Sequence, residues 1–504
     1  MSVSEQSNSR GLIRSMLVMG SAQAANIMIS ILRMKVLAVL LGPSGVGLLS
    51  IYSSLQGTVA QMAGLGMGSS GVREIASAGG KDETLGQVRR VLFVAHLVQG
   101  ILAMLAVWLL QDQISMWLFG DASRGVEVAW IGVAILVTLL SAAQTALLQG
   151  MRRIGDLART TILAAFLGTL AGLAAVWAYG ERGLVWFVLA QPLISFLVAL
   201  NYTRSLPRPA DVQSRSAELW GVWKRLVKLG LAFMLSGVAT ALALLLVRGF
   251  VSRELGLDAA GQFAAAWGIT MIYVGFLLGA MAADYYPRLT DIIKDRGAAV
   301  RLMNDQTQLS LAIGGPILLL LIGLAPWVIT LLYSAEFGPA ASLLQWQTFG
   351  NIFKLASWAM AFSIVSDARA KTYFFMEMSF SVVFLGLVLF LLPYVGLEVT
   401  AYAFVAGYLV YIATVYLLVR RIHGFRWEPL SLCLLALHAA LASGLLALAL
   451  VAPVMAAVAS PLLAVMTGFF GLRVVLTKTG PEGRLASGLA GFYEAIGWPI
   501  RGAA

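Results

Sequence analysis

The sequence predicts an all-α polytopic membrane protein with about fourteen transmembrane helices. Three observations lead to this fold class: an apolar composition, long uninterrupted apolar runs, and an uneven distribution of basic residues along the chain. Of the 504 residues, 60% are hydrophobic and 12% are charged, whereas soluble domains carry roughly 25% charged residues. This composition excludes a disordered chain, a secreted disulfide scaffold and an ordinary cytosolic enzyme.

The apolar runs are long enough to cross a bilayer, which takes about 20 residues per helix. They are continuous and lack the alternation with a period of two that a transmembrane β-barrel requires. The runs therefore predict helical spans. These expected spans cover residues 13–41, 48–72, 91–110, 127–150, 160–179, 184–201, 226–249, 262–283, 308–333, 343–366, 373–394, 397–419, 430–451 and 455–477.

The basic residues lie mostly in every second loop. If the N-terminus is cytoplasmic, 28 of the 35 Lys and Arg residues fall in cytoplasmic segments, four fall in the opposite loops and three lie inside spans. Cytoplasmic loops of membrane proteins collect Lys and Arg, so this bias predicts an even number of spans with both termini cytoplasmic. The net charge of +11 thus arises mainly from the basic residues that orient the helices in the membrane. Because these residues are dispersed over eight segments, nucleic-acid binding is not expected.

An internal repeat is visible in two loops. Residues 41–47 (LGPSGVG) and 255–261 (LGLDAAG) share Leu, Gly and the final Gly at an offset of 214 residues. Six spans separate the copies, so both have the same orientation, as in parallel-repeat transporters. The alternative is chance recurrence of Leu-Gly turns in a chain with 51 glycines. The expected organisation is a six-helix lobe over 1–203, a cytoplasmic linker over 204–225, a second six-helix lobe over 226–421, and two extra helices with a tail over 422–504.

Four short segments, in this order, resemble the polysaccharide-transporter family. They are residues 42–48 (GPSGVGL), 64–74 (GLGMGSSGVRE), 284–289 (DYYPRL) and 332–337 (LYSAEF). The chain is similar here to the Wzx-type O-antigen flippases and translocases, within the superfamily that includes the multidrug (MATE) exporters and the lipid II flippase. The resemblance covers roughly residues 10–425, so it carries nothing over to the last two helices.

This resemblance implies a transporter and not an enzyme. It implies that the protein moves undecaprenyl-pyrophosphate-linked O-antigen, or similar polysaccharide repeat units, from the cytoplasmic to the periplasmic leaflet of the bacterial inner membrane by alternating access. It also implies membrane lipid, a polysaccharide polymerase and a chain-length regulator as partners. The residues themselves predict neither catalytic groups nor a cofactor: Cys433 is the single cysteine, and no glycine-lysine phosphate-binding loop is present.

Lys354 is a charge in the middle of an expected span. A Lys or Arg there costs about 2.5–3.5 kcal/mol on insertion scales, which makes it a candidate functional residue. Gln347, Asn351 and Lys354 are spaced i, i+4, i+7 and share one helix face. We interpret this face as the polar lining of a central cationic cavity in which Lys354 binds an anionic substrate. The alternative is a buried lysine bonded to backbone carbonyls for structure alone.

Three more cations are candidates for the same cavity. Arg33 and Lys35 lie about 200° apart around a helix, so both do not face one cavity squarely. The alternative for this pair is that both side chains reach the outer interface. The resemblance favours Lys35, because a Lys seven residues before the Gly-Pro turn is similar to Wzx-type members. Arg248 lies next to Gly249, the repeat equivalent of Lys35, and either completes a cationic ring or anchors the interface.

Four glycines in the second span, Gly64, Gly66, Gly68 and Gly71, are expected to permit bending or close helix approach. Glycine is also simply common in membrane helices.

Two other functions compete with a flippase. A MATE-like cation-coupled exporter of small molecules shares the helix count and repeat, but its cavity would favour acidic residues, whereas the intramembrane charges noted here are basic. A membrane polysaccharide polymerase or ligase would need a substantial external loop with catalytic groups. The longest expected external loop is only residues 111–126, and no cluster of His, Asp and Glu accompanies it.

Overall fold

The computed structural model describes residues 3–78, 82–206, 216–480 and 484–500. These residues form helices joined by short turns, and no strand occurs among them. The predicted all-α fold is therefore confirmed. Of the expected linker, residues 207–215 lie outside the described residues.

Eleven helical segments in the described part of the chain are long and apolar enough to cross a membrane. Two of them, Gly20–Ala63 and Ile154–Arg204, have 44 and 51 residues, about twice the length that one crossing needs. The first is bent at Gly42, which has φ 63° and is followed by Pro43. The second contains two helices joined by a short 3₁₀ turn at Gly180–Arg182. Counted as separate crossings, and with the 40-residue helix Ser216–Leu255 added, these segments match the expected number of spans.

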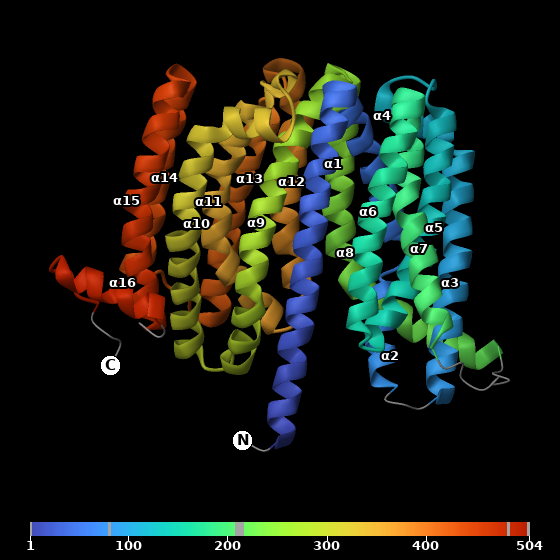
Figure 1. Ribbon diagram of the computed structural model, residues 1–504, viewed down its shortest axis with the longest axis horizontal. Helices are drawn as coiled ribbons and strands as arrows, with labels where there is room; N and C mark the ends of the chain where they lie inside the picture. Colours follow the sequence, from blue (N-terminus) through green and yellow to red (C-terminus); the bar gives the residue numbers. More distant parts are fainter. Residues whose placement is uncertain (1–2, 79–81, 207–215, 481–483, 501–504) are drawn as a thin grey trace. The chain divides into compact units, whose positions relative to one another are not determined.

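The chain forms two compact units, each with its own core. Unit 1 contains residues up to Gly261 together with Leu332–Ser334, and unit 2 contains Gln262–Leu331 and the residues from Ala335 onward. The helices of unit 1, shown in Figure 1, are α1 (Val3–Ala63), α2 (Met67–Ser77), α3 (Asp82–Leu109), α4 (Gln111–Phe119), α5 (Gly125–Gly150), α6 (Ile154–Tyr179), η1 (Gly180–Arg182), α7 (Gly183–Arg204) and α8 (Ser216–Leu255).

Helix α9 (Leu257–Ile292) begins in unit 1 and continues into unit 2. The other helices of unit 2 are α10 (Arg296–Leu332), η2 (Ala335–Phe337), α11 (Ala340–Ser366), α12 (Ala370–Val395), α13 (Val399–His423), α14 (Pro429–Val451), α15 (Pro453–Thr479) and α16 (Arg484–Ala495). Helix α8, which the sequence assigns to the second lobe, packs with unit 1. The division into two six-helix lobes stays a prediction.

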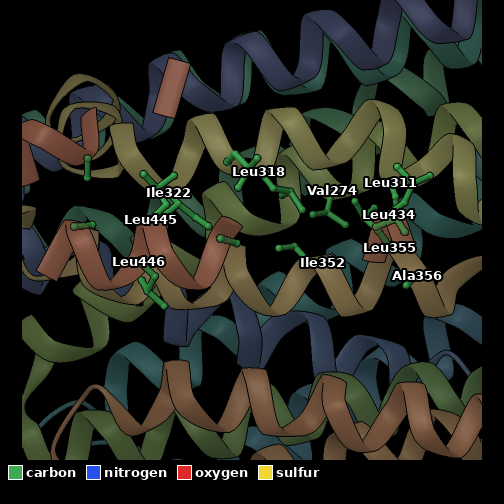
Figure 2. Packing of buried hydrophobic residues seen from close by; sticks show 14 of the residues in the cluster. Val274, Leu311, Leu318, Ile322, Ile352, Leu355, Ala356, Leu434, Leu445 and Leu446 are labelled. Carbon is green, nitrogen blue, oxygen red and sulfur yellow. The ribbon is translucent and has the colours of Figure 1, made fainter. Parts of the chain in front are cut away.

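Apolar side chains hold the helices of each unit together. In unit 1, buried residues of α2, α3, α5 and α8 such as Met67, Val88, Leu147 and Leu226 form one cluster. In unit 2, Figure 2 shows Leu318 and Ile322 of α10 facing Leu445 and Leu446 of α14, with Ile352 and Leu355 of α11 nearby. Burial of this kind fixes the positions of the polar side chains that the same helices carry.

The two copies of the repeated loop contact each other reciprocally within unit 1. A Cβ added to Gly47 would overlap the carbonyl oxygen of Leu257, and one added to Gly261 would overlap the carbonyl oxygen of Pro43. Both the two glycines and the two carbonyl residues are 214 positions apart. This pairing is what a two-fold relation between the copies produces. It also explains why each copy ends in glycine, since any side chain would push the two backbones apart.

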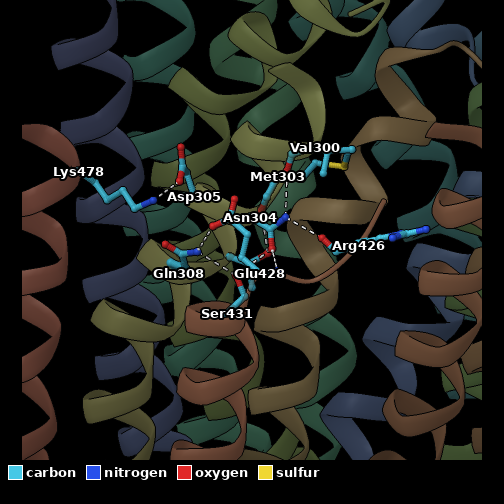
Figure 3. A network of polar contacts seen from close by, with 10 residues as sticks. Val300, Met303, Asn304, Asp305, Gln308, Arg426, Glu428, Ser431 and Lys478 are labelled. Atoms are coloured by element: carbon cyan, nitrogen blue, oxygen red, sulfur yellow. Dashed lines mark hydrogen bonds and ion pairs between the residues drawn. The ribbon is translucent and has the colours of Figure 1, made fainter. Parts of the chain in front are cut away.

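A polar network attaches the last two long helices to α10 (Figure 3). Asn304 Nδ2 donates to the Arg426 carbonyl at 3.0 Å, and Asn304 Oδ1 accepts from the Glu428 backbone N–H and the Ser431 hydroxyl, each at 2.9 Å. Gln308 Nε2 donates to Glu428 Oε2 at 2.8 Å. An ion pair between Lys478 and Asp305 adds α15 to the same end of α10. The two helices thus form part of the folded unit.

Candidate functional site

Lys354 lies near the middle of α11, with its side chain partly exposed. Its ammonium is 5.3 Å from the centroid of the Tyr408 ring on α13 and within electrostatic range of Glu377 on α12. In the described part of the chain it makes no hydrogen bond or ion pair, and its backbone carbonyl accepts from Ser357 at 3.0 Å. The alternative interpretation, a lysine tied to backbone carbonyls, is therefore not supported.

Glu377 is a charged residue that the sequence interpretation missed. Its carboxylate accepts a hydrogen bond of 2.8 Å from the Tyr411 hydroxyl of α13, and its side chain is only partly exposed. The statement that the intramembrane charges are basic is thus wrong, because Glu377 lies inside the expected span 373–394. The signal was available, since one carboxylate in an apolar run of that length is as unusual as one lysine.

The rest of the expected polar stripe has other partners. Gln347 and Asn351 are both 0% exposed. Gln347 Oε1 accepts from the Thr270 hydroxyl at 2.9 Å, and Asn351 Nδ2 donates to the Tyr273 hydroxyl at 2.6 Å. These two side chains are therefore used in packing α11 on α9, instead of lining an open space. Gln347, Asn351 and Lys354 do lie on one face of α11, but this face packs against different neighbouring helices: α9 contacts Gln347 and Asn351, and α13 contacts Lys354.

Arg33 and Lys35 point to different neighbours in unit 1, as their spacing around the helix predicts. Arg33 Nη1 donates to Gln191 Oε1 at 2.9 Å, and its guanidinium lies 5.7 Å from the centroid of the Phe187 ring. Both partners belong to α7. Lys35 Nζ donates instead to the backbone carbonyl of Tyr333 at 2.5 Å. Each of these cations is tied to the protein.

Arg248 joins Lys35 around Tyr333. Its Nη1 donates to the carbonyl oxygen of Ser50 at 3.0 Å and to the hydroxyl of Ser54, both in α1. It also interacts electrostatically with Tyr333, whose side chain is buried. Unit 1 therefore holds Lys35 and Arg248 near Tyr333, which belongs to one of the four segments (332–337) that resemble the polysaccharide-transporter family. Arg33 is not part of this group.

The glycines of the second span have separate roles. The helix breaks at Gly64–Gly66, where Leu65 and Gly66 have positive φ and α2 starts anew at Met67. A Cβ at Gly66 would overlap the Gly230 carbonyl of α8, so this position also requires glycine for close approach. Gly68 and Gly71 lie within α2 and do not bend it, and only Gly71 has a close neighbour, Leu92.

The described residues contain no group of three or more His, Cys, Asp and Glu side chains that could hold a metal ion. Within unit 2, the candidate site consists of the Lys354 ammonium, the Glu377 carboxylate, the Tyr408 ring and the Tyr411 hydroxyl. Such a set can pair with and release an anionic group.

A family model described as "Polysaccharide biosynthesis protein" matches residues 36–342, more than half of the chain. The chain belongs to this polysaccharide biosynthesis protein family. The matched region begins one residue after Lys35, contains both repeated loops and Tyr333, and ends before Lys354. The membership thus confirms the polysaccharide family that the four motifs indicate.

Curated relatives match beyond the family region. The lipid III flippases of Escherichia coli (strain K12) and of Shigella flexneri are each 24% identical to this chain over 399 residues. The alignment covers 77% of this chain and 94% of each flippase. The similarity therefore extends over nearly the whole length of these relatives.

Two solved structures have the same fold. The lipid II flippase MurJ in an inward closed conformation gives a TM-score of 0.66 at 14% identity, covering 95% of this chain and 99% of MurJ. An inward-facing multidrug resistance MATE family transporter of the MOP superfamily gives 0.67 at 17% identity, covering 79% of this chain and 94% of the transporter. The 5% that MurJ leaves uncovered is shorter than α14 and α15 together, so the shared fold includes at least part of these two helices.

Proposed function

We propose that this protein is a flippase for lipid-linked oligosaccharide. In its finer form the proposal is that it moves undecaprenyl-pyrophosphate-linked repeat units, of O-antigen or a similar polysaccharide, from the cytoplasmic to the periplasmic leaflet by alternating access. The observation that carries it is Lys354: a cation in the middle of a span, without an ion-pair partner in the described part of the chain.

The chemistry of such a substrate calls for a cation of this kind. A pyrophosphate headgroup loses its hydration when it leaves the membrane surface, and a direct charge-assisted hydrogen bond offsets part of that cost. The Lys354 ammonium lies near the Tyr408 ring, which stabilises a cation without neutralising its charge. Glu377 keeps the charge balanced when no substrate is present. In this proposal the headgroup takes the place of Glu377 as the counter-charge of Lys354.

The relatives support the coarser part of the proposal. The curated relatives are named lipid III flippases, and MurJ is named a lipid II flippase. They are transporters, which agrees with the expectation that this chain is not an enzyme. A bacterial inner membrane location, cytoplasmic termini, and contacts with a polysaccharide polymerase and a chain-length regulator are further parts of the proposal.

The test is transbilayer movement of a fluorescent polyprenyl-pyrophosphate oligosaccharide in proteoliposomes that contain the full chain. Wild-type protein is expected to move it, and Lys354→Ala to slow it by about ten- to a hundred-fold, the effect of losing a hydrogen bond to a charged group. Lys354→Arg tests for charge alone. Lys294→Ala, which removes an exposed lysine at the end of α9, is the matched control and should move the lipid normally.

The outcomes separate the activity from the site. If wild-type protein moves no lipid-linked sugar, the proposed function is wrong. If wild-type protein and Lys354→Ala are equally active, the function stands and the role of Lys354 is wrong. In cells, Lys354→Ala should abolish surface polysaccharide while lipid-linked repeat units accumulate.

Glu377 gives one reason to keep a second candidate, a MATE-like exporter of small cations. A carboxylate inside a span is the group that such an exporter would use for its substrate. Here, however, the carboxylate is bonded to the Tyr411 hydroxyl and lies near Lys354. Uptake of a cationic dye by proteoliposomes, lost in Glu377→Gln but not in Lys354→Ala, would favour the exporter.

A further inference from the structure

The C-terminal helix α16 has no place in the proposed transport function, yet it is held against α15 by specific contacts. Its Tyr493 is fully buried, and the Tyr493 hydroxyl donates to the Phe469 carbonyl of α15 at 2.5 Å. Trp498, just beyond α16, lies under Arg473 of α15, whose guanidinium is 4.4 Å from the ring centroid. Arg473 also donates to the Pro499 carbonyl at 3.3 Å. The segment is therefore docked on α15.

The docking point lies where the apolar part of α15 gives way to polar contacts. Lys478, which pairs with Asp305, marks the polar end. Phe469 lies nine residues earlier, about 14 Å along the helix at 1.5 Å per residue. Two residues after Phe469, Gly471 packs closely against the backbone of Ala312 in α10. Figure 1 shows α16 crosswise to α15 at this end. With 12 residues, α16 is too short to cross a bilayer.

One side of α16 is apolar and largely exposed. Leu489, Phe492 and Ile496, the residue just after the helix, are spaced i, i+3, i+7 and so lie on this side, with Phe492 54% and Ile496 50% exposed. The Phe492 ring touches Phe469 of α15 edge-on, with ring centroids 6.2 Å apart. Glu494 lies about 200° around the helix from Phe492 and is also exposed. The helix is thus amphipathic, with one face bound to α15 and an adjacent apolar face that the described residues cover only in part.

Helix α15 also carries an exposed apolar surface. On α15 itself, Leu462, Val465 and Met466 are 63%, 71% and 68% exposed, as expected for a span whose outer face contacts acyl chains. The aromatic residues at the docking point, Phe469, Tyr493 and Trp498, are the types that gather at the level of the headgroups. Arg473 adds a positive charge there, which suits anionic headgroups.

We infer that α16 is an interfacial helix that inserts Leu489, Phe492 and Ile496 into the headgroup–acyl boundary of the leaflet at this end of α15. Amphipathic helices of this kind bury their apolar face about 5–10 Å into that boundary. The partner is thus the lipid surface itself. Through Tyr493 and Trp498, the insertion holds the end of α15 at a fixed depth.

The test uses the full chain in nanodiscs, with Cys433→Ser as background and a single environment-sensitive fluorophore on a new cysteine. Phe492→Cys places the label on the apolar face, and Glu494→Cys, two residues away, is the matched control on the opposite face. Lipids brominated near the headgroup end of the acyl chain should quench the Phe492→Cys label at least about twofold more than lipids brominated near the chain terminus, as the shallow depth requires. The Glu494→Cys label should respond to aqueous iodide and not to either lipid.

Two results would overturn the inference. In the first, both labels respond equally to iodide and neither to brominated lipid, which would place α16 in water. In the second, the Phe492→Cys label is protected from both quenchers only in discs that hold two copies of the chain, which would make the face a protein–protein contact. A failure of lipid flipping would leave this test unaffected, because it needs no substrate.

Discussion

The intramembrane cations of the two units differ in what surrounds them. In unit 1, Lys35 and Arg248 are bonded to the backbone carbonyls of Tyr333 and Ser50, and Arg33 is bonded to Gln191. In unit 2, Lys354 lies by the Tyr408 ring and within electrostatic range of Glu377, and it forms no hydrogen bond or ion pair with the described residues. A charge that is already bonded to the protein stabilises the fold, whereas a charge without such a bond is available to a ligand. A cation inside a span thus serves either the fold or a ligand, depending on whether the protein already bonds to it.

This comparison predicts opposite profiles for two substitutions. The largest effect on transport is expected from Lys354→Ala, a loss of about ten- to a hundred-fold with little change in thermal stability, because the lysine side chain forms no hydrogen bond with the described residues. The measurement is flipping rate and thermal unfolding of the same preparations. A large drop in melting temperature with unchanged flipping would reverse the assignment.

Arg248→Ala should act mainly on stability. It removes the bonds to the Ser50 carbonyl and the Ser54 hydroxyl and leaves these acceptors without their donor. The expected cost is about 1.5–3 kcal/mol, the range for hydrogen bonds to charged groups. Thermal unfolding in detergent measures it, with Arg253→Ala on the exposed end of α8 as the control. An unchanged unfolding temperature would show that Arg248 is as available as Lys354.

Gln347→Ala tests whether the buried part of the α11 stripe is structural. The substitution leaves the Thr270 hydroxyl without its acceptor, at a cost of about 1–3 kcal/mol, and should leave the flipping rate of the folded protein nearly unchanged. If flipping falls as far as in Lys354→Ala while stability is unaffected, Gln347 contacts the substrate after all.

Tyr411→Phe is expected to have little effect on transport and to act on stability. It removes one hydroxyl that donates to the Glu377 carboxylate, a loss of about 1.5–3 kcal/mol in stability, the range for hydrogen bonds to charged groups. Because Lys354 remains in place, flipping should change by less than about threefold. A loss as large as that of Lys354→Ala would show that Glu377 positions the lysine and does not merely balance its charge.

The sequence was sufficient for the fold class, the spans and the opposite directions of Arg33 and Lys35. These follow from hydrophobic length and from the angle between successive residues, which a helix sets by itself. The shared motif of the two loops was visible in the sequence, although the reciprocal contact of Gly47 and Gly261 with backbone carbonyls appears only in three dimensions.

The candidate site was predictable only in part. The insertion cost of a charge pointed to Lys354, but helical periodicity cannot say which neighbour a face meets. Gln347 and Asn351 therefore shared a face with Lys354 and yet packed on α9. Glu377 could have been found by the same criterion as Lys354, because an isolated carboxylate in a span is equally costly. Its pairing with Tyr411 depends on the packing of α12 against α13, which no local pattern encodes.

The most direct test of the central claim compares two headgroups on the same polyprenyl chain. Proteoliposomes with wild-type protein or Lys354→Ala would be supplied with a pyrophosphate-linked sugar or with an uncharged sugar ether. If Lys354 pairs with the headgroup, the substitution slows only the pyrophosphate lipid, by about tenfold or more. An equal loss on both lipids, or on neither, would contradict the claim that this lysine binds an anionic headgroup.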